Sequence, residues 1–516
     1  MSDVKAVRCL ALLSLLAVLG CSSSTSSESA GPPAPSDSLP ALSAVTDGVE
    51  PGRIVDSAGR EVLLRGVNVN AHVDYWQYDP DLFIAYPFTE ADADMIAAMG
   101  WNMVRLLLSW SRVEPRPGEY DEAYLDEYAE SVAMLRERGV YTLLDLHQDA
   151  WGPSLVAPPD EVCPDSEPAG GWDGAPDWAT FDDGEPRCER AERELVPAVR
   201  AAWVNFFNNR EGPGGVGIQT RYVQMFAHLV KRFAHDDSVA GYDLMNEPNQ
   251  FLPENAAKLS QFYEDALRAM REAEAEVGAP TRLFFFESSI AWNAIGLPAP
   301  PPFDHDDQVV FSPHIYQGGI DPGTLEEGFA RAAEETVRLY DGAPVVTSEW
   351  GSSPERAKDP VDDYFERHLR EQDNYLFGAT IWTWREACGD AHKYVDAREG
   401  RVPYVWGYFD VNCENNTVEG NRTEYTDVMR KIAVRFAPGA LSEVDWSPDD
   451  TGLAASGEDA RAGNRLEVFV PTDDPSSVDI ESTGLGAIES VPWFGGTLFY
   501  ARADGAPWSI RLSTVP

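Results

Sequence analysis

One short apolar run has ionisable side chains at its carboxyl end: Tyr141-Thr142-Leu143-Leu144-Asp145-Leu146-His147. A continuous apolar run of this length is typical of a strand that is buried on both faces of a parallel sheet. The stretch before it, residues 124–138, has apolar residues at i, i+3 and i+4 and is predicted to be an amphipathic helix. Together the two segments predict one β/α repeat.

Seven further runs repeat this pattern, with helical stretches such as residues 256–277 between them. They cover residues 62–68, 103–108, 241–247, 282–287, 309–314, 344–349 and 378–384. Eight repeats predict a (β/α)8 TIM barrel over residues 49–437, in preference to an open doubly wound sheet, for which the G-x-G-x-x-G motif is missing. Nearly every run ends in polar side chains, and in a barrel these ends meet at the face where active sites lie.

The helical period stops near residue 437. Beyond it, apolar residues alternate at period two between Gly, Asp and Pro turns, in residues 444–446, 466–470, 478–480, 497–500 and 508–512. Alternation of this kind predicts a small antiparallel β-sandwich over residues 438–516.

The N-terminus has the features of an export signal. Lys5 and Arg8 precede an apolar run over residues 9–20, which is too short to span a bilayer as a mature helix. The run ends in Val18-Leu19-Gly20-Cys21, which resembles a bacterial lipobox with Cys21 as the lipidated residue; an ordinary signal peptide with an incidental Cys is the alternative. Residues 1–21 are therefore interpreted as a lipoprotein-type signal peptide, and the Ser- and Pro-rich residues 22–48 as a flexible tether.

This interpretation predicts an exported protein, either a bacterial cell-envelope lipoprotein or a secreted one. No later segment reaches the roughly 18 continuous apolar residues of a membrane span, so we expect membrane contact through the lipid anchor only. We also expect a monomer.

Four cysteines remain once Cys9 is removed with the signal and Cys21 is acylated: Cys163, Cys188, Cys388 and Cys413. In an oxidising compartment they predict two disulfides, and three pairings are possible. The local pairing, Cys163 with Cys188 and Cys388 with Cys413, closes two loops of 25 residues. Neither C-x₂-C nor H-E-x-x-H occurs, so we expect no metal and no cofactor.

The composition limits the partners. The 516 residues include 40 Lys and Arg against 86 Asp and Glu, a formal charge of −46. This charge repels phosphate backbones and anionic bilayers, so no nucleic acid is expected. A neutral carbohydrate or glycolipid fits better as the substrate.

Two glutamates stand at the ends of predicted strands, in Asn246-Glu247-Pro248 and in Glu349-Trp350-Gly351. A carboxylate that must leave water among aromatic side chains is costly unless it is paired or functional. Two carboxylates that converge on one pocket are the apparatus of glycoside hydrolysis, in which one protonates the leaving oxygen and the other attacks or activates water. At the roughly 5–5.5 Å separation of retaining enzymes, each charge disfavours the other, which separates an acid from a nucleophile.

These two motifs, together with Asn102-Met103-Val104-Arg105, His147 and His314-x-Tyr316, resemble glycoside hydrolase family 5, a retaining family. The resemblance implies that Glu247 is the acid/base and Glu349 the nucleophile. It places Asn246 on the sugar 2-hydroxyl and Trp382, in preference to Trp384, under the −1 sugar. It also implies that Arg105, His147, His314 and Tyr316 belong to the substrate site. Among these, Arg105 and Tyr316 would hold Glu349 ionised and oriented.

Within that family the chain is similar to the endoglycoceramidases and related glycosylceramidases. The similarity is carried by residues 66–70, 143–149, 175–179 and 239–248, and these enzymes also have a C-terminal β-sandwich. It implies hydrolysis of the bond between glycan and ceramide, with Asp149 on sugar hydroxyls in the −1 subsite.

Two alternatives remain open at this point. One is an endo-β-glucanase of soluble β-glucans, for which Trp151, Trp172 and Trp178 would form an exposed row along a cleft instead of a lid. The other is a surface lipoprotein that binds glycans without turnover. The apolar residues 290–303, with Phe251 and Leu252, could receive a ceramide or pack against each other.

Overall fold

The computed structural model describes residues 39–250, 253–352, 362–393, 406–446, 452–505 and 507–514. The predicted signal peptide, Cys21, residues 22–38 of the predicted tether, Phe251 and Leu252 lie outside these ranges. Within them, no helix has the length and apolar character needed to cross a bilayer.

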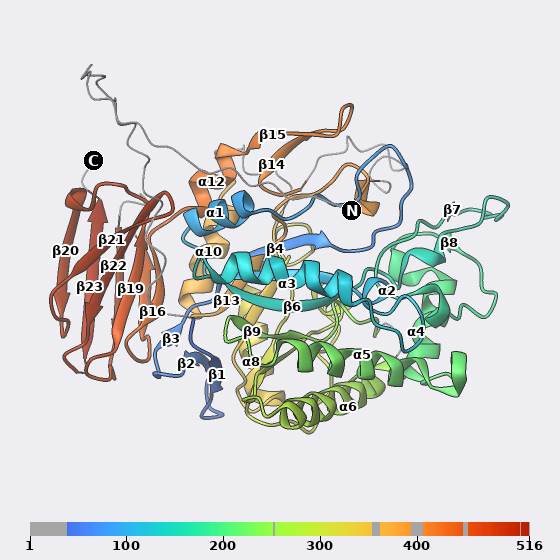
Figure 1. Cartoon of the computed structure of the whole chain (residues 1–516), viewed down its shortest axis with the longest axis horizontal. Coiled ribbons are helices and arrows are strands. Elements are labelled where there is room, and N and C mark those ends of the chain that lie inside the picture. The colour runs from blue at the N-terminus through green and yellow to red at the C-terminus, as the bar shows by residue number, and fades with distance from the viewer. Residues whose placement is uncertain are drawn as a thin grey trace, which may run out of the picture.

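All eight predicted barrel strands are present and parallel, which confirms the (β/α)8 barrel (Figure 1). The sheet has the order β11-β10-β9-β6-β5-β4-β13-β12, and a parallel bridge between Phe311 and Val345 closes it. The strands are β4 (Arg65–His72), β5 (Met103–Ser109), β6 (Tyr141–His147), β9 (Val239–Asp243), β10 (Leu283–Phe286), β11 (Val309–Phe311), β12 (Val346–Trp350) and β13 (Gly378–Ile381). Nearly all of their residues are buried on both faces, as the continuous apolar runs predict.

Helices surround this sheet, and the two that were predicted by residue range are confirmed within a few residues. The helices are α1 (Glu90–Ala98), α2 (Trp110–Val113), α3 (Glu122–Arg136), α4 (Pro197–Phe207), α5 (Ile218–Phe233), α6 (Pro253–Val277), α7 (Ile290–Ile295), α8 (Leu325–Leu339), α10 (Tyr364–Asn374) and α12 (Thr423–Met429). They shield the apolar outer face of the barrel from water.

Two excursions at the carboxyl ends of the strands are closed by disulfides. The first follows β6 and contains the short hairpin β7 (Glu167–Pro168) and β8 (Cys188–Glu189); the second follows β13 and contains the hairpin β14 (Phe409–Asn412) and β15 (Thr417–Asn421). Cys163 is bonded to Cys188 and Cys388 to Cys413, with Cα–Cα distances of 5.5 and 5.4 Å. The local pairing, one of the three possible, is therefore the one that forms.

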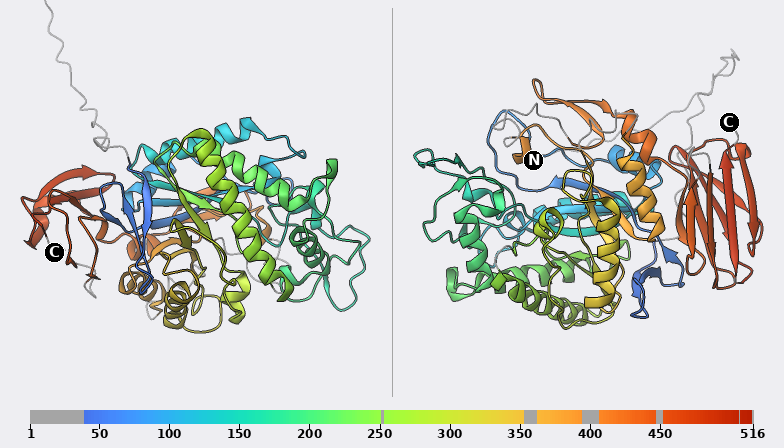
Figure 2. Two further views of the ribbon diagram at one scale, coloured as in Figure 1. Left: turned by 90° about the horizontal axis from the view of Figure 1, so that it is seen from below. Right: turned by 180° about the vertical axis from the view of Figure 1, so that it is seen from behind.

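The C-terminal sandwich lies at the opposite end of the barrel from the β7–β8 excursion (Figures 1 and 2). One sheet has the order β17 (Glu443–Trp446), β18 (Gly452–Gly457), β23 (Trp508–Thr514), β20 (Val478–Thr483). The other sheet runs β1 (Leu42–Val45), β2 (Arg53–Asp56), β3 (Glu61–Val62), β16 (Ala433–Ala437), β19 (Arg465–Val470), β22 (Gly496–Arg502), β21 (Glu489–Trp493). The five predicted sandwich runs all lie in these strands; β18 and β21 were not predicted, because small residues and Pro492 obscure their alternation.

Two predicted boundaries are wrong. Residues 42–45 form β1 and do not belong to a flexible tether, and residues 53–62, assigned to the barrel, are strands of the sandwich sheet together with β16. The physical reason is a shared core at the amino ends of the barrel strands. There Leu42 and Ile54 are buried with Tyr141, Phe285 and Phe436. Short N-terminal strands carry little periodicity of their own and gain their stability from this burial.

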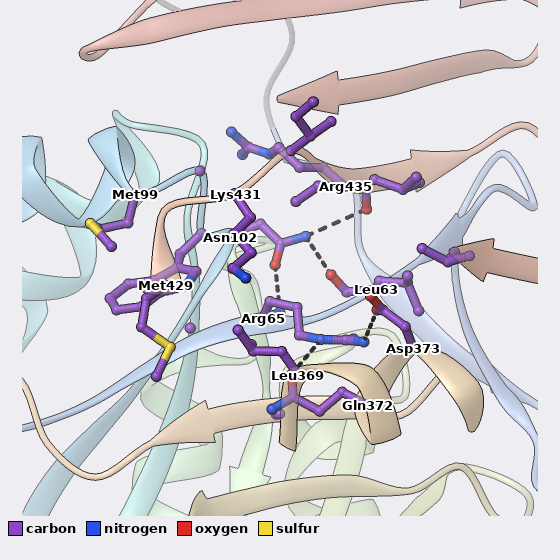
Figure 3. Close-up of a pocket in the computed structure, with 18 of the residues that line it drawn as sticks. Leu63, Arg65, Met99, Asn102, Leu369, Gln372, Asp373, Met429, Lys431 and Arg435 are labelled. Atoms are coloured by element: carbon purple, nitrogen blue, oxygen red, sulfur yellow. Dashed lines mark hydrogen bonds and ion pairs between the residues drawn. The ribbon is translucent and has the colours of Figure 1, made fainter. Parts of the chain in front are cut away.

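A pocket lies between part of the barrel and the sandwich (Figure 3). Arg65 crosses its wall and donates to Gln372 and Asp373 of α10, both at 2.8 Å. Asn102 accepts from the backbone of Arg65 and donates to the carbonyl of Leu63, both at 2.9 Å. These bonds tie the start of β4 to the helix beside the sandwich, at the end of the barrel away from the strand carboxyl ends.

Candidate active site

The predicted site residues gather at the carboxyl ends of the barrel strands. The parallel register aligns these ends, so that Ser109 of β5 lies opposite His147 of β6. A cavity opens there. Of the nine predicted catalytic and substrate-binding residues, those that line it are His147, Asp149, Asn246, Glu247, Tyr316, Glu349 and Trp382.

Glu349, within β12, is held by two donors. Arg105 donates from Nη1 to its Oε1 at 2.8 Å, and the Tyr316 hydroxyl donates to its Oε2 at 2.9 Å. Burial raises the pKa of Glu349, and the positive charges of His314 and Arg105 oppose that rise. Both bonds fix the direction of the carboxylate and favour its ionised form.

Glu247 follows β9 and faces Glu349 across the cavity. Nδ1 of His314 lies 2.8 Å from Oε1 of Glu247 and 3.5 Å from Oε2 of Glu349. One carboxylate oxygen of each glutamate and a ring nitrogen of His314 lie within 4.8 Å of one another. Glu247 has a φ of 37°, a backbone conformation that a side chain of this kind rarely adopts, and such strain is typical of functional positions.

Beneath the two glutamates, Arg105 is the centre of a fully buried ionic cluster. Its guanidinium contacts Asp145 at 3.0 Å, Asp243 at 3.0 Å and Glu287 at 2.7 Å, in addition to Glu349. Burial opposes the charge on Arg105, but these carboxylates outweigh it and raise the pKa of the guanidinium. Arg105 and His314 therefore lie behind the cavity wall and hold the carboxylates that form it.

Asn246 is oriented by the same cluster. Its Oδ1 accepts from Nη2 of Arg105 at 3.0 Å, and its Nδ2 donates to the carbonyl of Gln148 at 2.9 Å. The amide is thereby fixed with its oxygen toward Arg105, which leaves the second Nδ2 hydrogen for the cavity that Asn246 lines.

His314 carries a positive charge between the glutamates. Burial opposes this charge, but Glu287, at 3.2 Å from Nε2, and Glu349 raise the pKa of His314 well above its usual range. Glu287 also accepts from the backbone N–H of Glu247 at 2.7 Å. One imidazolium and one buried carboxylate thus position the loop that carries Glu247.

Trp382 forms one side wall of the cavity. Its ring stacks on His147 with centroids 5.5 Å apart and an interplanar angle of 15°. His147 is held by Asp145 at 2.8 Å, and although burial opposes its charge, Asp145 raises the pKa of His147 to about 9. Trp384 is directed elsewhere, because its indole N–H donates to Asp92 of α1 at 3.0 Å.

Asp149 is paired with a cation that the sequence did not identify. Nη2 of Arg193 donates to Oδ1 of Asp149 at 2.6 Å and lies 3.8 Å from Oε2 of Glu247. His392 approaches Oδ2 of Asp149 at 3.5 Å from the other side. The Arg193 guanidinium itself lies over the ring of Trp172 at 4.3 Å.

Several functional positions were thus missed by sequence reasoning: Glu287, Arg193, Asp321, Glu386 and His392. Glu287 ends a predicted strand run, and that polar end was the available signal. The other four line the cavity from loops and single helical turns, which are too short for a periodic pattern to place a side chain.

The Trp residues of the first excursion do not form an exposed row. Trp151 and Trp172 are buried, and the indole N–H of Trp178 donates to the carbonyl of Glu114 at 2.9 Å. They pack the excursion against the barrel as a lid-like cover. Residues 290–303 were predicted either to pack together or to receive a ceramide. Trp292 and Phe303 are buried in the core, which fits packing. Ile290 lines the cavity together with Ile320, which is 53% exposed, so this position could contact a substrate.

A (β/α)8 barrel with two facing glutamates at its strand ends, one of them gripped by Arg and Tyr, is the arrangement of a glycoside hydrolase. Residues 55–387 match the family described as cellulase (glycosyl hydrolase family 5). The chain belongs to glycosyl hydrolase family 5.

Among characterised proteins, the chain is 31% identical to Endoglycoceramidase I of Rhodococcus hoagii (strain 103S) over 295 residues, which is 54% of each chain. The match thus spans about half the length of that relative. The crystal structure of an endogalactoceramidase is similar over 92% of this chain and 100% of that one, with 33% identity and a TM-score of 0.81. The lactosyl-enzyme intermediate of endo-glycoceramidase II from Rhodococcus sp. covers 90% of this chain and 99% of its own, with 26% identity and a TM-score of 0.68.

Proposed function

We propose that the protein hydrolyses the bond between the glycan and the ceramide of a glycosphingolipid by double displacement, with Glu349 as nucleophile and Glu247 as acid/base. The observation that carries the assignment is the asymmetry between the two carboxylates. Glu349 accepts from Arg105 and Tyr316 at once, which favours an ionised and oriented nucleophile. Within the described residues, the carboxylate of Glu247 has only His314 at hydrogen-bond distance.

In the first step, a Glu349 oxygen attacks the anomeric carbon while Glu247 gives its proton to the glycosidic oxygen. The ceramide leaves with its primary hydroxyl, and the sugar is bound to Glu349 as an ester. In the second step, Glu247 takes a proton from water, whose oxygen attacks the anomeric carbon. The ester bond breaks, the reducing sugar leaves with net retention, and both glutamates regain their starting states.

The cations around the glutamates support this cycle electrostatically. Arg105 and Tyr316 stabilise Glu349 as a carboxylate before attack and again as the leaving group of the second step. The buried position makes these fixed donors more effective than water would be.

The lipid part of the proposal rests on the relatives named above and on the wall of the cavity. Ile290 and Ile320 line it on the side of the loops after β10 and β11, and Ile320 continues to the surface. These two apolar side chains suit the departing ceramide, whereas Asp149 and His147, which also line the cavity, suit sugar hydroxyls.

Export and anchoring extend the proposal to the cell. We propose that residues 1–21 direct export and that Cys21 is acylated, in keeping with the Ser- and Pro-rich residues after it. The two disulfides support an oxidising compartment outside the cytoplasm.

Incubation with a substrate panel in detergent tests the reaction. The panel contains glucosylceramide, galactosylceramide, lactosylceramide, a ganglioside, carboxymethylcellulose and laminarin, and the released sugars are analysed by mass spectrometry. We expect free glycan and intact ceramide from at least one glycolipid and no product from the β-glucans. Activity on the β-glucans alone would contradict the lipid substrate and favour the endo-β-glucanase alternative.

A further inference from the structure

We propose that Glu386 is a sugar-binding residue, which accepts a hydrogen bond from a hydroxyl of the glycone and, with Asp149, selects which neutral sugar occupies the catalytic cavity. The inference rests on the proposed glycosidase function and adds a residue to the same site. Neither the sequence motifs nor the family resemblance assigns a role to Glu386.

Glu386 is fully buried and lines the same cavity as Glu247 and Glu349. Its Oε2 accepts from the Lys393 ammonium at 2.6 Å and from the backbone N–H of Trp406 at 2.6 Å. Its Oε1 has no hydrogen-bond partner within the described part of the chain. The carboxylate is therefore anchored through one oxygen, and its other oxygen is a buried acceptor that no described residue satisfies.

Asp149 repeats this arrangement on the neighbouring wall. Oδ1 accepts from Arg193 at 2.6 Å, while Oδ2 has no hydrogen-bond partner in the described ranges and lies 3.5 Å from Nε2 of His392 and 3.9 Å from Nε2 of His147. Two carboxylates are thus each fixed by a cation on one oxygen, and the second oxygen of each has no hydrogen-bond partner in the described part of the chain. A buried acceptor without a partner is costly, and sugar hydroxyls are the donors that a glycosidase cavity receives.

The segment that carries Glu386 is held firmly against the site. The disulfide between Cys388 and Cys413 follows it, and Asp390 binds Nδ1 of His392 at 2.6 Å. His392 also lines the cavity and links this segment to Asp149. Anchoring at several points keeps an acceptor within the narrow tolerance that a recognition site needs.

The charge of Glu386 favours neutral sugars. Burial raises the pKa of Glu386, and the Lys393 ammonium opposes that rise. A carboxylate here binds a hydroxyl by a charge-assisted hydrogen bond and repels a sugar with a carboxylate or sulfate at the same place.

Kinetics of Glu386→Gln test the proposal. In this variant the side-chain oxygen faces Lys393 and the backbone N–H of Trp406, so the amide group faces the cavity and an acceptor becomes a donor. We measure kcat/KM for the 4-nitrophenyl β-glucoside or β-galactoside, whichever wild type cleaves faster, and for its 3-, 4- and 6-deoxy analogues. We expect the variant to lose at least tenfold on the parent substrate and less than threefold on one deoxy analogue, because that analogue lacks the hydroxyl that Glu386 binds.

Glu414→Gln, an exposed glutamate near the second disulfide, is the matched control and should leave all four values unchanged. An equal loss on the parent and on all three analogues, or no loss, would overturn the proposal.

If Glu386→Gln does not fold, Glu386→Asp, which keeps the charge and withdraws the oxygen, must show the same selectivity. Labelling of Glu349 by a 2-deoxy-2-fluoro glycoside, measured in wild type and variant, distinguishes failure of the proposed function from failure of the role of Glu386. If wild type is not labelled, the proposed glycosidase function itself is contradicted.

Discussion

Nη1 of Arg105 donates to Oε1 of Glu349 over 2.8 Å, from a guanidinium that has no exposed surface. A fully buried arginine surrounded by carboxylates cannot move or lose its proton without breaking several charge-assisted bonds. It therefore holds Glu349 in one direction and in its ionised form, which is what attack on an anomeric carbon requires.

Glu349→Gln removes the nucleophile while keeping its shape. We expect kcat/KM on 4-nitrophenyl glycosides to fall by more than about 10³-fold, because the ester intermediate cannot form. Mass spectrometry after 2-deoxy-2-fluoro glycoside treatment should label the peptide containing Glu349 in wild type only. Full activity of the variant would refute the assignment; Glu371→Gln on α10 serves as the control.

Glu247→Ala removes the acid/base. The expected loss is about 10²–10⁴-fold on glycolipids, whose leaving group needs a proton, and smaller on dinitrophenyl glycosides, whose leaving group does not. Azide should restore turnover of the dinitrophenyl substrate and yield a β-glycosyl azide, detected by NMR, because the small anion fits where the side chain was. Absence of that product would count against the role of Glu247.

His314→Gln changes the acid limb of the pH profile. The positive charge of His314 lowers the pKa of Glu349 against the effect of burial, so its loss raises that pKa. The nucleophile must be ionised, and activity at low pH is therefore lost earlier. We expect the acid limb of kcat/KM to move to higher pH. The control His228→Gln, on the outer helix α5, should leave the acid limb unchanged. If the acid limb of His314→Gln does not move, or moves to lower pH, the positive charge assigned to His314 is contradicted.

Cys388→Ser with Cys413→Ser opens the loop that carries His392 and directly follows Glu386. For a loop of 25 residues, the chain-entropy model gives a loss of about 3 kcal/mol in the free energy of unfolding, which urea titration under non-reducing conditions measures. KM should also rise, because this segment forms a cavity wall. The pair Cys163→Ser with Cys188→Ser is the comparison: an equal loss of stability with the same rise in KM would show that the second disulfide has no particular link to the site.

Local sequence was sufficient for most of the barrel. Runs such as residues 141–147 are buried on both faces, and the polar residues near their ends, among them His147 and Glu349, meet because parallel strands align their carboxyl ends. The local disulfide pairing was one of three that spacing permitted, and the structure selects it.

Contacts between distant segments decided the rest. Arg193 and His392 reach Asp149 from two irregular excursions, and residues 42–62 join β16 in the sandwich sheet. No periodic pattern encodes such meetings, since they depend on how whole elements pack. The amino-acid sequence by itself therefore determined the barrel and its two glutamates, through hydrophobic periodicity and strand-end chemistry. Only the tertiary structure decided which cations and acceptors surround them, because burial and long-range ion pairs form only when those segments come together.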